Sequence, residues 1–339
     1  MKNTTIKNLF ARQEMILLLI LVAYSVFVGI MNPAFFRAST IFDILKGSAG
    51  PLLLALGTLV VMISGGVDVS STAVAIVSGY VSIRTMMALG IDNVVLAFVI
   101  SILMGVLLGA FNGLVIHRFE LPTLIATLGT QNIFVGAMAT FIGTTFISSR
   151  IMPESLVELG RGALVRVEVG GGEVGLTVNI IPVIVLVIVT WFILNRTMVG
   201  RSVFALGSDK LSARRAGLNL FRVRMFVYMY AGGLAGVMGV VYAANTRSFN
   251  PLSLVGDELN VIAAVVLGGA RLTGGVGTVL GTVLGVAIIT VLQQTLVLIG
   301  LSSSWNQFFV GVIILVSVGV TSYRTQKANR KNLTFITVQ

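Results

Sequence analysis

The stretch NVVLAFVISILMGVLLGAFNGLV, residues 93–115, decides the class of fold because it is long, apolar and free of charge. A helix needs about 20 mostly apolar residues to cross the hydrocarbon core of a bilayer. The whole chain of 339 residues has this character, with 56% hydrophobic residues, 10% charged residues and a mean hydropathy of +1.01. Water-soluble domains have roughly a quarter of their residues charged. The sequence therefore predicts an integral membrane protein that crosses a lipid bilayer several times.

Ten apolar stretches qualify as membrane-spanning helices. The run from Met15 to Ile30 follows basic residues and precedes no small-residue cleavage site, so we expect a retained first span. We interpret residues 1–339 as a single all-α transmembrane domain. Its third helix begins in a polar stretch, and its eighth is short. The predicted helices are at about residues 14–30, 44–64, 70–88, 93–115, 122–143, 177–195, 225–244, 259–270, 275–299 and 306–322.

The charges predict which ends of these helices face the cytoplasm. Lys and Arg gather in the cytoplasmic loops of membrane proteins, and this explains the net charge of +11 without a nucleic-acid partner. With the N-terminus inside, most of the 23 basic residues fall inside as well. We therefore expect both termini in the cytoplasm, an outer loop at 144–176, an inner loop at 196–224 and a basic cytoplasmic tail at 323–339.

Glycines recur every four residues in two of the apolar stretches. Small residues at this spacing form a flat stripe along a helix, and another backbone can approach it closely. We favour packing between helices of the same chain, and an interface between two subunits is the alternative. The glycines concerned are Gly105, Gly109 and Gly113 in one stretch and Gly277, Gly281 and Gly285 in the other.

Catalytic motifs are missing from the sequence. There is no cysteine and a single histidine, His117, which we interpret as a capping or interface residue. No Gly-x-x-x-x-Gly-Lys-[Ser/Thr] loop is present to hold the phosphates of ATP. We expect a protein that is not an enzyme and that binds no metal or cofactor itself. If ATP drives its activity, a separate subunit must hydrolyse the ATP.

Polar residues inside the apolar stretches are the candidates for a path through the membrane, because polar groups in spans usually face protein or water. A glycine pair followed by Asp68 predicts a discontinuous helix near residues 64–72, with Asp68 capping the helix that restarts. A direct role of Asp68 along the solute path is the alternative. Uncharged hydrogen-bonding groups suit a neutral, hydroxyl-rich solute. The candidate path residues are Ser64, Asp68, Ser70, Asn112, Thr127, Thr130, Gln131 and Asn132.

Four segments resemble one known family in the same order along the chain. Ser64-Gly-Gly-Val-Asp-Val-Ser70 and Leu121-Pro-Thr-Leu-Ile-Ala-Thr-Leu-Gly-Thr130 are similar to two of its conserved stretches. Thr197-Met-Val-Gly-Arg201 and Glu258-Leu-Asn-Val-Ile-Ala-Ala-Val-Val-Leu-Gly-Gly269 are similar to two more. The family is that of the ribose-type permease subunits of ATP-binding-cassette (ABC) importers, which serve ribose, arabinose, galactofuranose and a furanosyl quorum signal.

The resemblance implies a type II ABC importer permease with about ten helices in each subunit. It implies a second permease copy or paralogue, ABC ATPase subunits, an extracytoplasmic solute-binding protein and a bacterial cytoplasmic membrane around them. The expected function is translocation of a small sugar. The alternatives are an ABC permease for another solute, such as a nucleoside or an amino acid, and a stand-alone secondary transporter.

The resemblance also implies that the inner loop carries a short helix that couples the permease to the ATPase. The local sequence agrees, with an acid early in the segment, two arginines near its end and a glycine stop. A loop that only sets membrane orientation is the alternative. The residues expected to couple are Ser208, Asp209, Ala213, Arg214, Arg215, Ala216 and Gly217.

Overall fold

The computed structural model describes residues 13–169, 172–302, 304–313, 315 and 319. These residues form helices and one antiparallel hairpin, so the all-α class is confirmed apart from the hairpin. In chain order the elements are α2 (Gln13–Met31), the 3-10 helix η1 (Pro33–Phe36), α3 (Ala38–Ile63), α4 (Ser71–Leu89), α5 (Val94–Phe119), α6 (Thr123–Phe141), α7 (Glu154–Arg161), β1 (Ala163–Val169), β2 (Gly172–Thr177), α8 (Ile180–Arg196), α9 (Met198–Ser208), α10 (Lys210–Arg215), α11 (Leu220–Thr246), α12 (Glu258–Leu267) and α13 (Val279–Thr295).

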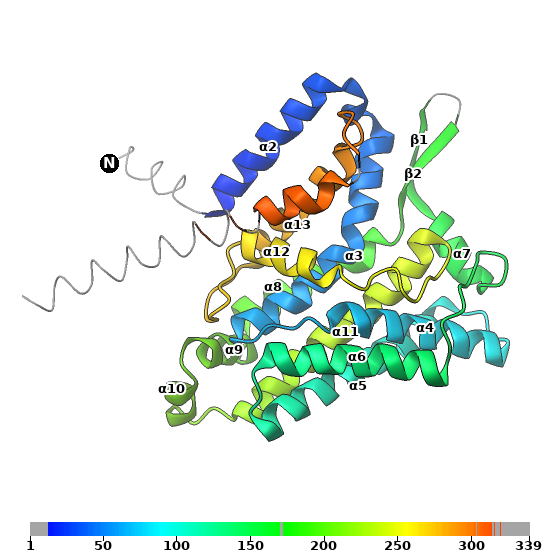
Figure 1. Cartoon of the computed structure of the whole chain (residues 1–339). Helices are drawn as coiled ribbons and strands as arrows, with labels where there is room; N and C mark the ends of the chain where they lie inside the picture. Colours follow the sequence, from blue (N-terminus) through cyan, green and yellow to red (C-terminus); the bar gives the residue numbers. More distant parts are fainter. Residues whose placement is uncertain (1–12, 170–171, 303, 314, 316–318, 320–339) are drawn as a thin grey trace, which may run out of the picture.

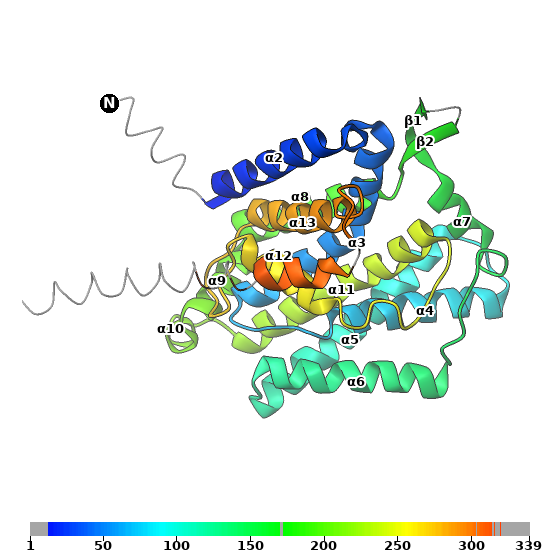
Figure 2. The ribbon, with the colours of Figure 1, turned by 45° about the horizontal axis from the view of Figure 1, so that its top comes forward.

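Two long helices, α3 and α11, lie at the centre of the fold (Figure 1). α11 packs along α5, α3 and α4, while α3 also contacts α8, α12 and α13. On one flank α2 packs against α13, and on the other α6 forms an outer layer over α4 and α5, as Figure 2 shows from a second direction. The core lies between these helices, where the side chains of Leu56, Leu59 and Tyr80 have no exposed surface.

Six of the described helices, α2 to α6 and α11, are long and apolar enough to cross a membrane. α8 and α9 pass the same test together but are bent by 71° where they meet. α12 has only 10 residues, which span about 15 Å, or half of the hydrocarbon thickness. The predicted eighth span, 259–270, is therefore not a full crossing. The membrane fold is confirmed, but the count of ten is not reproduced.

The last predicted span, 306–322, lies partly beyond the described residues. Residues 305–313 are helical, as expected for its first half. The remainder of that span and the basic tail at 323–339 lie almost entirely outside the described part of the chain.

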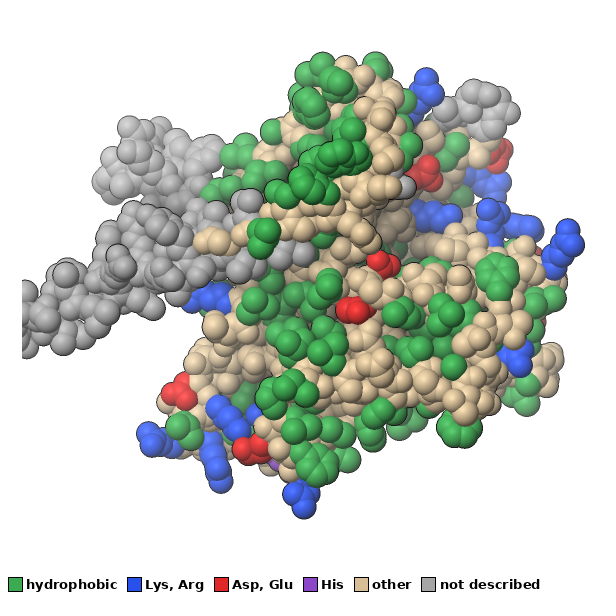
Figure 3. Space-filling model, viewed as in Figure 1, with side chains coloured by type: hydrophobic (Ala, Val, Ile, Leu, Met, Phe, Trp, Pro, Cys, Tyr) green, Lys and Arg blue, Asp and Glu red, His purple; other side chains and the backbone are tan. Residues whose placement is uncertain are grey.

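Apolar side chains cover the outer faces of the helices. Leu19 on α2, Leu107 on α5 and Ile188 on α8 are each half exposed or more. Figure 3 shows such side chains spread over the middle of the molecule, with Lys and Arg gathered toward two ends, around α10 and around the β1–β2 hairpin. Lipid is the surrounding that suits an apolar band of this kind. We call the two ends the α10 end and the hairpin end.

The predicted break near residues 64–72 is present. α3 ends at Ile63, Gly65 adopts a left-handed φ of +85°, and α4 begins only at Ser71. The residues between are not helical and run from the α10 end toward the middle of the molecule (Figure 1). A break at membrane depth is tolerated only where its backbone groups find partners within the protein.

The two long connecting segments are structured. The predicted outer loop, 144–176, contains α7 and most of the hairpin, whose strands pair in antiparallel fashion. The predicted inner loop, 196–224, contains α9, α10 and the first turn of α11. These elements lie at opposite ends of the molecule (Figure 1).

Candidate functional site

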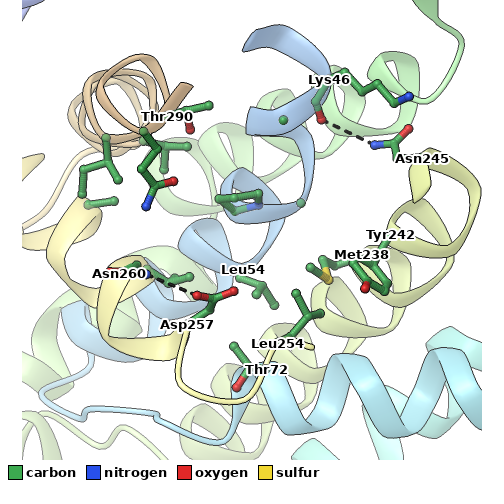
Figure 4. A pocket seen from close by; sticks show the side chains of 18 of the residues that line it. Lys46, Leu54, Thr72, Met238, Tyr242, Asn245, Leu254, Asp257, Asn260 and Thr290 are labelled. Carbon is green, nitrogen blue, oxygen red and sulfur yellow. Dashed lines mark hydrogen bonds between the residues drawn. The ribbon is translucent and has the colours of Figure 1, made fainter. Parts of the chain in front are cut away.

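A cavity of about 530 Å³ lies between α3, α11, α12 and α13 (Figure 4). The exposed side chains of Asp43, Thr246 and Asp257 line it, so the cavity is accessible on the side of the hairpin end. At greater depth it is lined by Leu54, Val261 and Ala264 among others. Toward the α10 end, α3 continues as a run of fully buried residues, 59–63, which closes that side.

The polar groups of the cavity wall are mostly uncharged amides and hydroxyls. They come from five segments of the chain, and several hydrogen bonds join them. Asn260 Nδ2 donates to Asp257 Oδ1 over 3.3 Å, Gln294 Nε2 donates to the Asp43 carbonyl over 3.1 Å, and Asn245 Nδ2 donates to the Lys46 carbonyl over 3.5 Å. The polar lining comprises Asp43, Lys46, Thr72, Tyr242, Asn245, Thr246, Asp257, Asn260, Thr290, Gln293 and Gln294. Such a wall can hydrogen-bond a neutral polar solute from several sides.

A buried network holds the helix break in place. The Ser70 backbone N–H and hydroxyl both donate to Asp68 Oδ1, over 2.8 and 2.7 Å, and Asn112 Nδ2 donates to Ser70 Oγ over 2.8 Å. Asp68, Ser70 and Asn112 are all buried. The prediction that Asp68 caps the restarting helix is wrong in detail, because its carboxylate bonds to Ser70, which precedes α4, and to no N–H of that helix.

α6 supplies hydrogen-bond partners for the backbone between α3 and α4. Val67 N–H donates to Thr123 Oγ1 over 2.9 Å, and Val69 N–H donates to Thr127 Oγ1 over 3.3 Å. The hydroxyls on this face of α6 thus replace the hydrogen bonds that a continuous helix would make. Thr123 was not among the predicted residues. Its position directly after Pro122, at the start of α6, is a signal that its hydroxyl is available to bond another segment.

Glu258 joins three elements in the interior. Its carboxylate accepts hydrogen bonds from Thr72 Oγ1 on α4 over 3.0 Å, from Gln131 Nε2 on α6 over 3.1 Å and from the Gly256 N–H over 3.0 Å. Thr72 also lines the cavity. Glu258 therefore fixes the start of the half-length helix α12, and with it part of the cavity wall, against α4 and α6.

The predicted path residues do not all meet. Asp68, Ser70, Asn112, Thr127 and Gln131 lie in the two bonded groups just described, and the Thr130 hydroxyl bonds to the Thr127 carbonyl over 3.2 Å. None of the predicted residues lines the cavity itself.

Two predicted path residues lie apart from both groups. The Ser64 hydroxyl bonds only to its own helix, at Val61 O, and Asn132 is exposed on α6, where its side chain bonds to Leu128 O. Asn132 therefore lies on the outer surface of this chain, on a different face of α6 from Thr127 and Gln131, and its role along the path stays a prediction.

The segment predicted to couple forms a short helix. α10 spans Lys210–Arg215, with Asp209 as its N-cap: the carboxylate accepts from the N–H groups of Leu211 and Ser212. The Ser212 hydroxyl and these N–H groups hold the pKa of Asp209 below its ordinary value, so the cap is ionised at neutral pH. Gly217 follows in a left-handed conformation with φ of +83° and ends the helix.

The exposed face of α10 differs from the prediction at one residue. Arg214, Arg215, Ala216 and Gly217 are exposed, whereas Ala213 is buried, with 4% of its surface exposed. Ala213 and Ala216 therefore do not form a common face for a partner. The side chain of Ala213 is occupied within this chain, where α10 packs against α9.

Glycines bring the end of α9 into contact with the end of α3 and with the turn between α12 and α13. The helices α3, α12 and α13 also line the cavity. Gly275 N–H donates to the Ile63 carbonyl at the end of α3 over 2.9 Å. A Cβ added to Gly274 would lie 2.6 Å from Gly65 Cα and 2.7 Å from the Gly207 carbonyl oxygen. The ends of α3 and α9 and the turn between α12 and α13 are thus in backbone contact. Ser208, which follows Gly207, bonds to the Phe204 carbonyl and continues directly into α10.

The predicted glycine stripes lie at helix contacts within the chain. Gly105 and Gly109 on α5 face the backbone of α11 at Gly232 and Tyr228, and Gly113 faces Met225 on the same helix. Gly281 and Gly285 on α13 face the carbonyls of Gly268 and Ala264. Gly277 precedes α13 and meets side chains of α3 instead, so the second stripe has two helical members rather than three.

The fold is that of a helical membrane protein, with a cavity of mixed apolar and polar lining toward the hairpin end and the helices α9 and α10 at the opposite end. Residues 40–318 match the family described as "Branched-chain amino acid transport system / permease component". The chain therefore belongs to this family of transport permeases.

The relatives include import permeases for autoinducer 2 and for ribose. The autoinducer 2 import system permease protein LsrC of Enterobacter sp. (strain 638) is 34% identical, over 92% of this chain and 86% of the relative. The ribose import permease protein RbsC of Bacillus subtilis is 32% identical, over 86% of this chain and 88% of the relative. That of Escherichia coli (strain K12) is 29% identical, over 91% and 93%. No solved structure matches the chain.

Proposed function

We propose that this chain is the membrane-spanning permease subunit of an ABC importer that takes up a small sugar or a sugar-like solute. The observation that carries the proposal is the cavity at the hairpin end, whose wall offers amides and hydroxyls with only three charged side chains. A sugar presents hydroxyls in every direction and no net charge, so a wall of this kind suits it. The relatives are import permeases for ribose and for autoinducer 2.

The proposal includes the parts that the chain lacks. ABC ATPase subunits would dock at the α10 end, a second permease copy or paralogue would pack alongside, and a solute-binding protein would deliver the solute at the hairpin end. ATP-driven motion of α10 would reach the cavity through the glycine contacts of Gly65, Gly207 and Gly274. In this arrangement the chain lies in a bacterial cytoplasmic membrane, with its termini and α10 in the cytoplasm.

Reconstitution tests this function. Proteoliposomes that contain the permease, its ATPase and its binding protein should accumulate labelled ribose or a related sugar only when ATP is present. The permease alone should show neither ATPase activity nor uptake. Uptake by the lone permease that follows a proton or sodium gradient would assign the chain to the secondary transporters. Uptake of a nucleoside or an amino acid, with no uptake of sugars, would correct the solute class.

A further inference from the structure

A second hollow, of about 420 Å³, lies at the hairpin end beside the cavity. Arg161 at the end of α7 and Arg247 after the end of α11 line it, together with the hydroxyl groups of Ser148, Ser149 and Thr246. Thr246 also lines the cavity. The two spaces are therefore adjacent, and a group bound in the hollow would sit at the mouth of the solute cavity.

The frame that carries the two arginines is fixed by backbone contacts. Ile147 and Phe249 exchange two backbone hydrogen bonds, of 3.0 and 2.8 Å, which tie the segment before α7 to the segment after α11. The Phe249 side chain is fully buried against Tyr80. Gly160 lies directly against the Ala244 carbonyl, so the last turn of α7 is pressed onto α11. The backbone positions of Arg161 and Arg247 are thus fixed by contacts within the chain.

Arg247 has an unusual backbone conformation. Its φ is +51°, and it is one of two non-glycine residues with positive φ among the described residues. Glycine and asparagine adopt this conformation readily, whereas other residues are strained in it. Strain of this kind is typical of functional positions, where a particular side chain is needed in spite of it. A glycine could end α11 in this conformation without strain. The presence of an arginine there therefore indicates that its side chain has a role.

The charge of the hollow is not neutralised within the part of the chain that the structure describes. The ion pairs found there are Arg166 with Glu173 and Lys210 with Glu120, and neither includes Arg161 or Arg247. Both arginines are exposed. Two guanidinium groups, with the hydroxyl-bearing residues Ser148 and Ser149 beside them, suit a carboxylate or a phosphate.

We propose that this hollow receives a carboxylate side chain of the solute-binding protein and so aligns its solute site with the cavity. The inference rests on the proposed function. The shared residue Thr246 favours a protein carboxylate over a lipid phosphate, because a group bound there lies beside the opening through which the solute enters. The fixed frame favours a docking contact over a mobile gate.

The test measures how tightly the fluorescently labelled binding protein, encoded with the permease, binds the permease–ATPase complex in nanodiscs of phosphatidylcholine. Arg247→Gly removes the charge and relieves the backbone strain, so it should fold at least as well as the wild type. Arg161→Gln removes the second charge. Each should raise the dissociation constant about tenfold or more and make it less sensitive to salt. Arg166→Gln, which removes a charge already paired with Glu173, is the matched control and should bind as the wild type does.

The outcomes separate this inference from the proposed function. Binding of wild-type strength in both Arg247→Gly and Arg161→Gln, while wild-type uptake is intact, would overturn the docking site and leave the permease function standing. Unchanged protein binding with weaker association of the variants with anionic phosphatidylglycerol would assign the hollow to a lipid phosphate, which also overturns the proposal. Absence of sugar uptake and of binding-protein association in the wild type would instead contradict the proposed function.

Discussion

At the residue scale, buried polar side chains hold the helix break by hydrogen bonds that the sequence only partly predicts. The glycine pair followed by an acid predicted a helix break, and a break is present between Ile63 and Ser71. The partner of the Asp68 carboxylate could not be predicted, because helix capping and the two-residue turn to Ser70 have the same local sequence signal. Asn132 shows the same limit, since the hydropathy of α6 does not indicate which face meets lipid.

Asp68 acts as a hydrogen-bond acceptor for Ser70, and this predicts how its variants behave. Asp68→Asn keeps an oxygen acceptor and should retain most of the uptake. Asp68→Leu leaves the buried N–H and hydroxyl of Ser70 without that acceptor, at a cost of about 1–3 kcal/mol. Thermal unfolding in detergent should show a lower midpoint for the leucine variant alone. An asparagine variant of normal abundance without uptake would mean that the negative charge itself is required.

At the element scale, hydropathy predicted where most helices lie but not what they enclose. Within the described residues the long apolar runs are helical, because the lipid environment forces the backbone to satisfy its own hydrogen bonds. The cavity depends instead on which helices meet, and its walls come from segments as distant as Asp43, Asn245 and Gln294. Their polar residues lie near helix ends. At such positions the sequence pattern of a cavity wall is the same as that of a water-exposed surface.

α10 provides a matched pair of alanines. Ala216 is exposed at the end of the helix and Ala213 is buried. Ala216→Trp should therefore leave abundance and thermal stability intact while the ATPase no longer co-purifies. Ala213→Trp overfills a packed position and should lower stability by about 1–3 kcal/mol. If Ala216→Trp retains the ATPase and the stimulation of its hydrolysis by the binding protein, the contact with the ATPase lies elsewhere.

The carboxylate of Glu258 holds α12 against α4 and α6. Substitutions of Glu258 and of its partner Thr72 should therefore have effects that do not add. Glu258→Leu should reduce both uptake and the stimulation of ATP hydrolysis by the binding protein, because Thr72 and Gln131 lose their acceptor. Thr72→Val should have a smaller effect, and almost none once Glu258 is replaced. Glu258→Gln keeps an acceptor oxygen and should restore part of the activity. Effects of Glu258→Leu and Thr72→Val that simply add would show that the two side chains act independently.

At the scale of the whole molecule, the charged residues and the two structured ends predict one orientation. α7 lies at the hairpin end and α10 at the other (Figure 1). The chain contains no cysteine, so single-cysteine variants need no background removal. In intact cells, Glu154→Cys, at an exposed position at the start of α7, should react with an impermeant thiol reagent, and Ser212→Cys should react only after the cells are opened. The reverse pattern at both sites would invert the proposed topology.

The central claim is that the solute crosses the membrane through the cavity between α3, α11, α12 and α13. ATP-dependent sugar uptake by proteoliposomes of the full importer, before and after a bulky thiol reagent modifies Asn260→Cys, tests it most directly. Asn260 lines the cavity, whereas Arg166 is exposed on the β1–β2 hairpin and provides the control variant Arg166→Cys. Modification should abolish uptake in Asn260→Cys and leave it unchanged in Arg166→Cys. Undiminished uptake by fully modified Asn260→Cys would contradict the account.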